Sequence, residues 1–221
     1  MAKLLAVDGD SKFKGKPRLR RVPGSVIQQP ENEVSVQIDR NDALALALSA
    51  MQGARDDEAM TLLRALAEAE PDFAEAHYLL AAQYAQLGDM AAAEAGFRHV
   101  LRLSPQQSMA RFQLGQLLAL AGRPAEAIEV LAPLAHVGEG ALAAYAAAIS
   151  CWAAADVEGA IALLRQGLAE PQQFDALKQD MVQLHARLAA IAAGTAEGIA
   201  TEEASPVHGA SLYLSNYRRY N

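Results

Sequence analysis

The chain has 221 residues, of which 52% are hydrophobic but only 5% aromatic, and its formal net charge is −7 at pH 7. No window approaches the roughly 20 uninterrupted apolar residues of a membrane span, and residues 1–10 lack the charged start, apolar run and cleavage site of a signal peptide. A single cysteine, Cys151, cannot form an internal disulfide, which favours a soluble protein of a reducing cytoplasm, and the richness in alanine is associated with bacterial proteins.

The first 39 residues are expected to form a basic, extended arm. Residues 1–21 contain seven basic and two acidic side chains, a net charge of +5, whereas the remainder carries −12. The basic residues of the arm that lie close together are Lys12, Lys14, Lys16, Arg18, Arg20 and Arg21. An extended chain would present most of them along one edge, for an acidic protein surface, anionic lipid or nucleic acid. Nucleic acid is disfavoured because the rest of the chain is acidic, and a solvated arm is the alternative.

The arm ends in an alternating apolar stretch. Val34, Val36 and Ile38 are separated by polar residues, which is typical of a short strand or an extended segment. A lone strand needs a partner, which could be another part of the tails, a second subunit or a client that adds a strand.

From residue 40 to about residue 170, the same residue types return every 33 or 34 positions. Small residues form one column, Ala59, Ala93, Ala127 and Ala160, and larger apolar residues form another, Leu63, Phe97, Leu131 and Leu164. A fixed period in this range is typical of a solenoid. Helical spacing between the punctuating residues makes each unit a pair of antiparallel helices.

Three kinds of residue set the expected geometry of the pairs. Alanine at a helix crossing lets the two backbones approach closely. Gly88 and Gly122 are expected to end first helices in the left-handed conformation. Pro133 lies within a predicted second helix, which it should shorten or kink because it lacks an N–H group and clashes with the preceding turn.

The unit from residue 74 to 105 resembles a tetratricopeptide repeat. The residues that match the pattern of this family in type and order are Leu80, Ala81, Tyr84, Gly88, Ala93, Phe97 and Pro105, and only His77 departs from it. The resemblance implies an all-α, right-handed helical-hairpin solenoid of about four tetratricopeptide-like repeats in residues 40–193. It also implies that the first helix of each repeat lines a groove for a protein partner.

Carried over by the period, the implied groove is apolar and partly aromatic. Its residues are Leu44, Leu48, Met51, Tyr78, Ala82, Gln86, Phe112, Gln116, Tyr145, Ile149 and Trp152. Such a surface suits an extended or helical apolar segment, whereas the Lys, Asn and Arg set that clamps a carboxylate in related domains is missing. The alternative is that Tyr78, Phe112 and Tyr145 pack between repeats.

A capping helix is expected at residues 172–193. Its apolar stripe consists of Phe174, Leu177, Met181, Leu184, Leu188 and Ile191. The stripe would cover the open face of the fourth repeat, as solenoids require, or form a coiled-coil seam for self-association.

Residues 194–221 are expected to be a flexible linker followed by a docking tail. The aromatic and basic residues of this tail are Tyr213, Tyr217, Arg218, Arg219 and Tyr220, which are types that anchor protein interfaces. A tail folded back on the solenoid is the alternative.

No pattern in the chain points to catalysis, a metal or a cofactor. The five histidines are far apart in sequence and none is paired at one-turn spacing with a histidine or cysteine, so no metal motif is present. Neither a phosphate-binding loop nor a nucleophile elbow occurs. We therefore expect a non-enzymatic scaffold without cofactors, acting as an adaptor or chaperone for an apolar segment of a partner. The alternatives are a structural subunit of a secretion or cell-envelope assembly, held by its tails, and a regulatory subunit of an enzyme complex.

Overall fold

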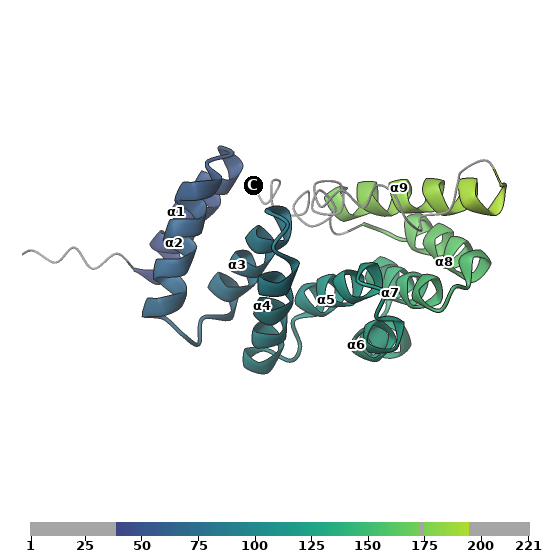
Figure 1. Ribbon diagram of the computed structural model, residues 1–221, viewed down its shortest axis with the longest axis horizontal. Coiled ribbons are helices and arrows are strands. Elements are labelled where there is room, and N and C mark those ends of the chain that lie inside the picture. The colour runs from purple at the N-terminus through teal and green to yellow at the C-terminus, as the bar shows by residue number, and fades with distance from the viewer. Residues whose placement is uncertain (1–38, 173–174, 195–221) are drawn as a thin grey trace, which may run out of the picture. The chain divides into compact units, whose positions relative to one another are not determined.

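The computed structural model describes residues 39–172 and 175–194, all within a compact unit that begins at Ile38. The described residues form helices and turns, and Figure 1 shows four helix pairs in chain order followed by a ninth helix. The helices are α1 (Arg40–Gln52), α2 (Asp56–Ala69), α3 (Ala74–Gln86), α4 (Met90–Leu103), α5 (Ser108–Leu120), α6 (Pro124–Val137), α7 (Gly140–Ala153), α8 (Val157–Ala169) and α9 (Asp175–Ala192). The predicted all-α solenoid of about four helical hairpins is confirmed.

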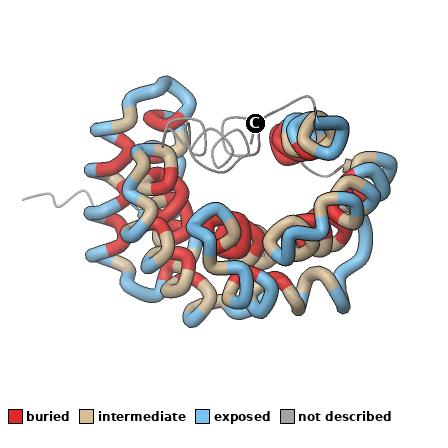
Figure 2. The backbone as a smooth tube through the Cα atoms, turned by 45° about the vertical axis from the view of Figure 1, so that its right-hand side comes forward, coloured by how far each residue is buried: buried red, intermediate tan, exposed pale blue. Residues whose placement is uncertain are grey.

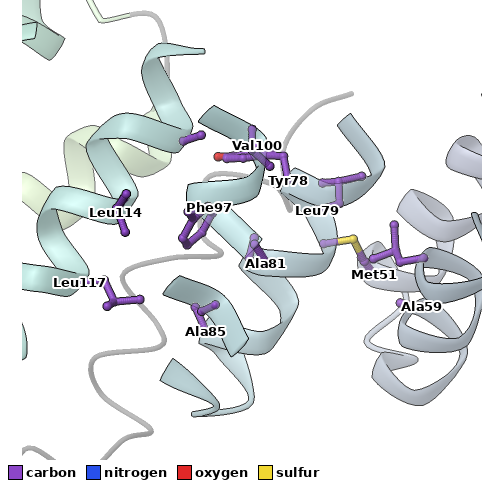
Figure 3. Packing of buried hydrophobic residues seen from close by; sticks show 14 of the residues in the cluster. Met51, Ala59, Tyr78, Leu79, Ala81, Ala85, Phe97, Val100, Leu114 and Leu117 are labelled. Atoms are coloured by element: carbon purple, nitrogen blue, oxygen red, sulfur yellow. The ribbon is translucent and has the colours of Figure 1, made fainter. Parts of the chain in front are cut away.

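Small residues lie where the helices of a pair cross. Ala59, Ala93, Ala127 and Ala160, one on each second helix, are all fully buried. On α4, Phe97 lies one turn beyond Ala93 in a cluster with Tyr78 and Ala81 of α3 and Leu114 of α5 (Figure 3). Across the helices of the described part, buried residues lie on the sides that face neighbouring helices (Figure 2). The predicted columns are therefore the packing columns of the core.

The first helix of each pair is followed by one residue in the left-handed conformation. Gly88 and Gly122 have φ values of 82° and 71°, as the sequence predicts. The equivalent positions in the first and fourth pairs carry alanines, Ala54 and Ala155, with φ values of 53° and 63°. An alanine side chain is strained there because its Cβ approaches the carbonyl oxygen.

Replacing Ala54 or Ala155 with glycine is expected to raise the free energy of unfolding by about 0.5–1 kcal/mol. Relief of roughly 1–2 kcal/mol of left-handed strain exceeds the roughly 0.4–1 kcal/mol by which glycine stabilises the unfolded chain. Gly122→Ala should lower the same quantity by a similar amount. Urea unfolding of the three variants measures this, and a loss of stability on Ala54→Gly would contradict it.

Pro133 does not shorten α6. The helix has 14 residues, the same number as α2 and α4, so the predicted shortening is wrong, while the alternative of a kink stays a prediction. The proline lies in the tenth position, where it removes one hydrogen bond. Packing holds the remaining turn, because Leu131 is fully buried and Leu134 packs against the same cluster.

Four charged side chains join the second helices of the middle pairs. Two ion pairs join the helices, Arg98 of α4 with Glu126 of α6 at 2.9 Å and Arg123 at the start of α6 with Glu94 of α4 at 2.6 Å. The same arginines also pair with the glutamate of their own helix. Hydrogen bonds from Arg123 hold the pKa of Glu126 below its ordinary value. For Glu94, burial alone would raise the pKa, but the hydrogen bonds from Arg123 and Arg98 outweigh it and lower the pKa. The network is half-exposed, so its contribution to stability is modest.

Helix α9 packs against α8 and closes the core of the fourth pair. Leu177, Met181 and Leu188 of its apolar stripe are buried in the same cluster as Ile149 of α7 and Leu164 of α8. This placement is the one expected of a capping helix. The stripe residue Phe174 lies outside the described residues. Residue 172, the predicted start, is not helical, and the described helix comprises Asp175–Ala192.

Candidate functional site

Most residues of the predicted groove are buried in this structure. Seven are buried, namely Met51, Tyr78, Ala82, Phe112, Gln116, Tyr145 and Ile149. Four are partly exposed, namely Leu44, Leu48, Gln86 and Trp152. All eleven lie on the first helices α1, α3, α5 and α7. The predicted groove, which was chosen by the repeat period, therefore contains both buried packing residues and surface residues.

The three aromatic rings of the predicted ligand-facing column lie in the core. Tyr78 is 1% exposed and its ring centroid lies 5.9 Å from that of Phe97 on the neighbouring helix. Phe112 and Tyr145 are fully buried in the cluster of the third and fourth pairs. This placement corresponds to the alternative in which the rings pack between helices, and a partner could reach them only after the core opens.

Tyr145 is held by two contacts at the end of α8. A Cβ atom on Gly167 would lie 2.5 Å from Cε1 of Tyr145, so the ring requires a glycine there. The Tyr145 hydroxyl donates to Oε1 of Gln172 at 2.9 Å, and Nε2 of Gln172 donates to the carbonyl oxygens of Gly167 and Glu170. Burial raises the pKa of the phenol. Gln172 therefore connects the segment that follows α8 to the core through hydrogen bonds. No sequence pattern indicated this contact.

Three residues of the predicted groove, Gln116, Ile149 and Trp152, line a pocket between three helices, which we name the α5/α7/α9 pocket. Its lining residues are Gln116 and Leu120 of α5, Ile149 and Trp152 of α7, and Met181, Leu184 and Arg187 of α9. The pocket volume is about 60 Å³. At roughly 10–15 Å³ for each water molecule, this volume holds about four to six waters. That is comparable to the space taken by one large side chain.

Apolar groups at the mouth of the pocket are open to solvent. Leu120 is 46% exposed, and Trp152 and Leu184 are partly exposed. Arg187 is exposed and supplies the charged group, while the buried Gln116 supplies an amide. A mostly apolar lining with a few polar groups is typical of ligand pockets in proteins.

Sequence reasoning identified Gln116, Ile149 and Trp152 but missed the other four lining residues. Leu120 lies one position beyond Ala119, which has the same place in the third repeat as Trp152 in the fourth. Met181, Leu184 and Arg187 come from α9, whose stripe predicts packing against the last pair but not a shared wall with α5. Extending the predicted groove by one residue along α5 would have included Leu120. The contribution of α9 depends on tertiary packing, for which the sequence has no local signal.

The other side chains that could take part in chemistry, a histidine and the cysteine, contact the surrounding protein. His77 donates from Nε2 to the carbonyl oxygen of Pro71 at 2.9 Å, and burial lowers its pKa. Burial also raises the pKa of the Cys151 thiol, and Asp156 raises it further. In residues 39–172 and 175–194, no group of three His, Cys, Asp or Glu side chains could hold a metal ion. Within the same ranges, no helix is long and apolar enough to cross a membrane.

The predicted tail sites lie outside the described residues. These are the basic arm, Lys12, Lys14, Lys16, Arg18, Arg20 and Arg21; the stretch Val34–Ile38; and the docking tail, Tyr213, Tyr217, Arg218, Arg219 and Tyr220. Their predicted interactions stay predictions.

Comparison with solved structures identifies related folds at low sequence identity. MamA (residues 41 to the end) from Desulfovibrio magneticus RS-1 has a TM-score of 0.53 and 19% identity, covering 80% of this chain and 92% of that one. TTC0263, a thermophilic TPR protein of Thermus thermophilus, has a TM-score of 0.55 and 16% identity, covering 68% and 81%. PilW, a type IV pilus biogenesis factor, has a TM-score of 0.56 and 20% identity, covering 81% and 76%.

No protein-family model and no curated protein matches the chain. The structural likenesses nevertheless confirm the resemblance to tetratricopeptide repeat proteins at the level of the fold.

Proposed function

We propose that the chain is a non-enzymatic adaptor that binds an apolar segment of a partner protein, with one large side chain of that segment in the α5/α7/α9 pocket. The observation that carries the proposal is the combination of an open apolar recess with the half-exposed Leu120 and the partly exposed Trp152 at its mouth. Exposed apolar groups around a recess are typical of sites that bind another chain.

The lining favours a segment with an aliphatic or aromatic anchor. Leu120, Ile149 and Leu184 present only hydrocarbon, and Trp152 adds a large ring face. The amide of Gln116 could bond a backbone group of the bound segment, and the guanidinium of Arg187 could lie on an aromatic ring of that segment. Recognition would then rest on one buried anchor surrounded by a polar edge.

The proposal can be tested with peptides selected from a random phage library against the immobilised full chain. Leu120→Ala and Trp152→Ala should each weaken binding of a selected peptide roughly tenfold or more, because anchors of an interface typically contribute about 2 kcal/mol. Calorimetric titration measures the dissociation constants, and thermal melting confirms that the variants fold.

Leu46→Ala is the matched control. Leu46 is 50% exposed on α1 and does not line the pocket, so its replacement should leave the affinity unchanged. Peptides that bind Leu120→Ala and Trp152→Ala as tightly as the original chain would contradict the proposed site. An equally large loss of affinity with Leu46→Ala would show that exposed leucines contribute to peptide binding wherever they lie, and not through the pocket.

A further inference from the structure

We infer that the α5/α7/α9 pocket is occupied by this chain's own segment Leu212–Leu214, which a partner must displace. The inference rests on the proposed function and adds a regulatory element to the same site. It joins two observations: the pocket is mostly apolar and has a volume of about 60 Å³, and the sequence that follows α9 carries a Leu-Tyr-Leu triplet.

The chain length between α9 and the triplet suits this contact. Leu184 in the pocket lies eight residues before Ala192 at the end of α9, a distance of about 12 Å along the helix. The 17 residues from 195 to 211 are mostly small or polar. A linker of this composition and length has a root-mean-square span of roughly 21–25 Å, so the triplet can return to the pocket without stretching the chain.

Tethering makes even a weak contact effective. A linker whose typical span is comparable to the required distance gives the triplet an effective concentration on the order of millimolar. The triplet follows α9, a helix that itself lines the pocket, whereas the apolar stretch Val34–Ile38 precedes α1 in the first helix pair. The connectivity therefore favours the triplet over the N-terminal stretch as the intramolecular occupant.

The chemistry of the triplet matches the lining. Leu212, Tyr213 and Leu214 provide hydrocarbon and one ring for the surface formed by Leu120, Trp152 and Leu184. If the tethered triplet fills the pocket for about nine-tenths of the time, a competing segment binds roughly tenfold more weakly than it would to the open pocket. The pocket would then admit only partners that outcompete the triplet.

Fluorescence of the full-length chain provides the test, because Trp152 is its only tryptophan. In the variant L212S/Y213S/L214S, acrylamide should quench Trp152 more strongly than in the original chain. A phage-selected peptide should bind this variant roughly tenfold more tightly. Circular dichroism checks that helix content is unchanged, and E202Q/E203Q in the linker is the matched control that should change neither measurement.

Several results would overturn the inference. Equal quenching and equal peptide affinity in the original chain and the triplet variant would do so, while leaving the proposed function intact. A difference that grows with protein concentration would assign the pocket to a segment of a second copy, and a difference caused by V34S/V36S/I38S instead would assign it to the N-terminal stretch. Stronger quenching in the triplet variant without any peptide binding would support the inference and count against the proposed adaptor function.

Discussion

Phe112→Ala is expected to lower the free energy of unfolding by about 3–5 kcal/mol. The ring is fully buried on α5, in a cluster with Leu131 of α6 and Tyr145 of α7. Its removal deletes a fully buried ring at the junction of the third and fourth pairs and leaves a cavity that close-packed helices fill only in part. Tyr78→Ala should have an effect of similar size. Urea unfolding measures both.

Leu87→Ala is the control for these variants. Leu87 is 55% exposed just after α3, and surface replacements usually change stability by no more than about 0.5 kcal/mol. If Phe112→Ala unfolds at the same urea concentration as Leu87→Ala, the ring is accessible rather than part of the core. That result would support the prediction from sequence that Phe112 faces a ligand.

Ala127→Leu is expected to lower the free energy of unfolding by about 1–3 kcal/mol, because three added heavy atoms must fit where α5 and α6 cross. Ala127 has no exposed surface, and Leu131, one turn further along α6, already fills the neighbouring space. Neighbouring helix pairs depend on each other in a solenoid, so the loss should extend beyond the third pair.

Ala125→Leu on the same helix separates overpacking from helix propensity. Ala125 is exposed, and leucine is nearly as good a helix former as alanine, so this control should melt close to the original chain. Equal melting temperatures for Ala127→Leu and Ala125→Leu would show that the proposed crossing column is in the wrong register.

The repeat period was sufficient to predict the core columns, because each repeat places the same residue types at the same helix crossing. Ala93 and Phe97 were identified in this way and both are fully buried. The left-handed positions were predicted only where glycine marks them, since Ala54 and Ala155 have no turn signal of their own. The period from Gly88 and Gly122 could have located both.

The binding surface was predicted less completely than the fold. The period places Tyr78 and Phe112 in the same column as the partly exposed Leu44, but it does not state how deeply each side chain is covered. That depends on the neighbouring pair, which differs along the stack. The wall contributed by Met181 and Leu184 required the position of α9 relative to α5 and α7, which is a long-range property without a local sequence signal.

Methyl and indole NMR of the full chain during titration with a phage-selected peptide is the most direct test of the α5/α7/α9 pocket. We expect the largest chemical-shift changes at Leu120, Ile149, Leu184 and the Trp152 indole, while the exposed Leu46 on α1 and Ile128 on α6 keep their shifts. Changes centred on Leu46 or Ile128, with the pocket resonances unmoved at saturation, would contradict it.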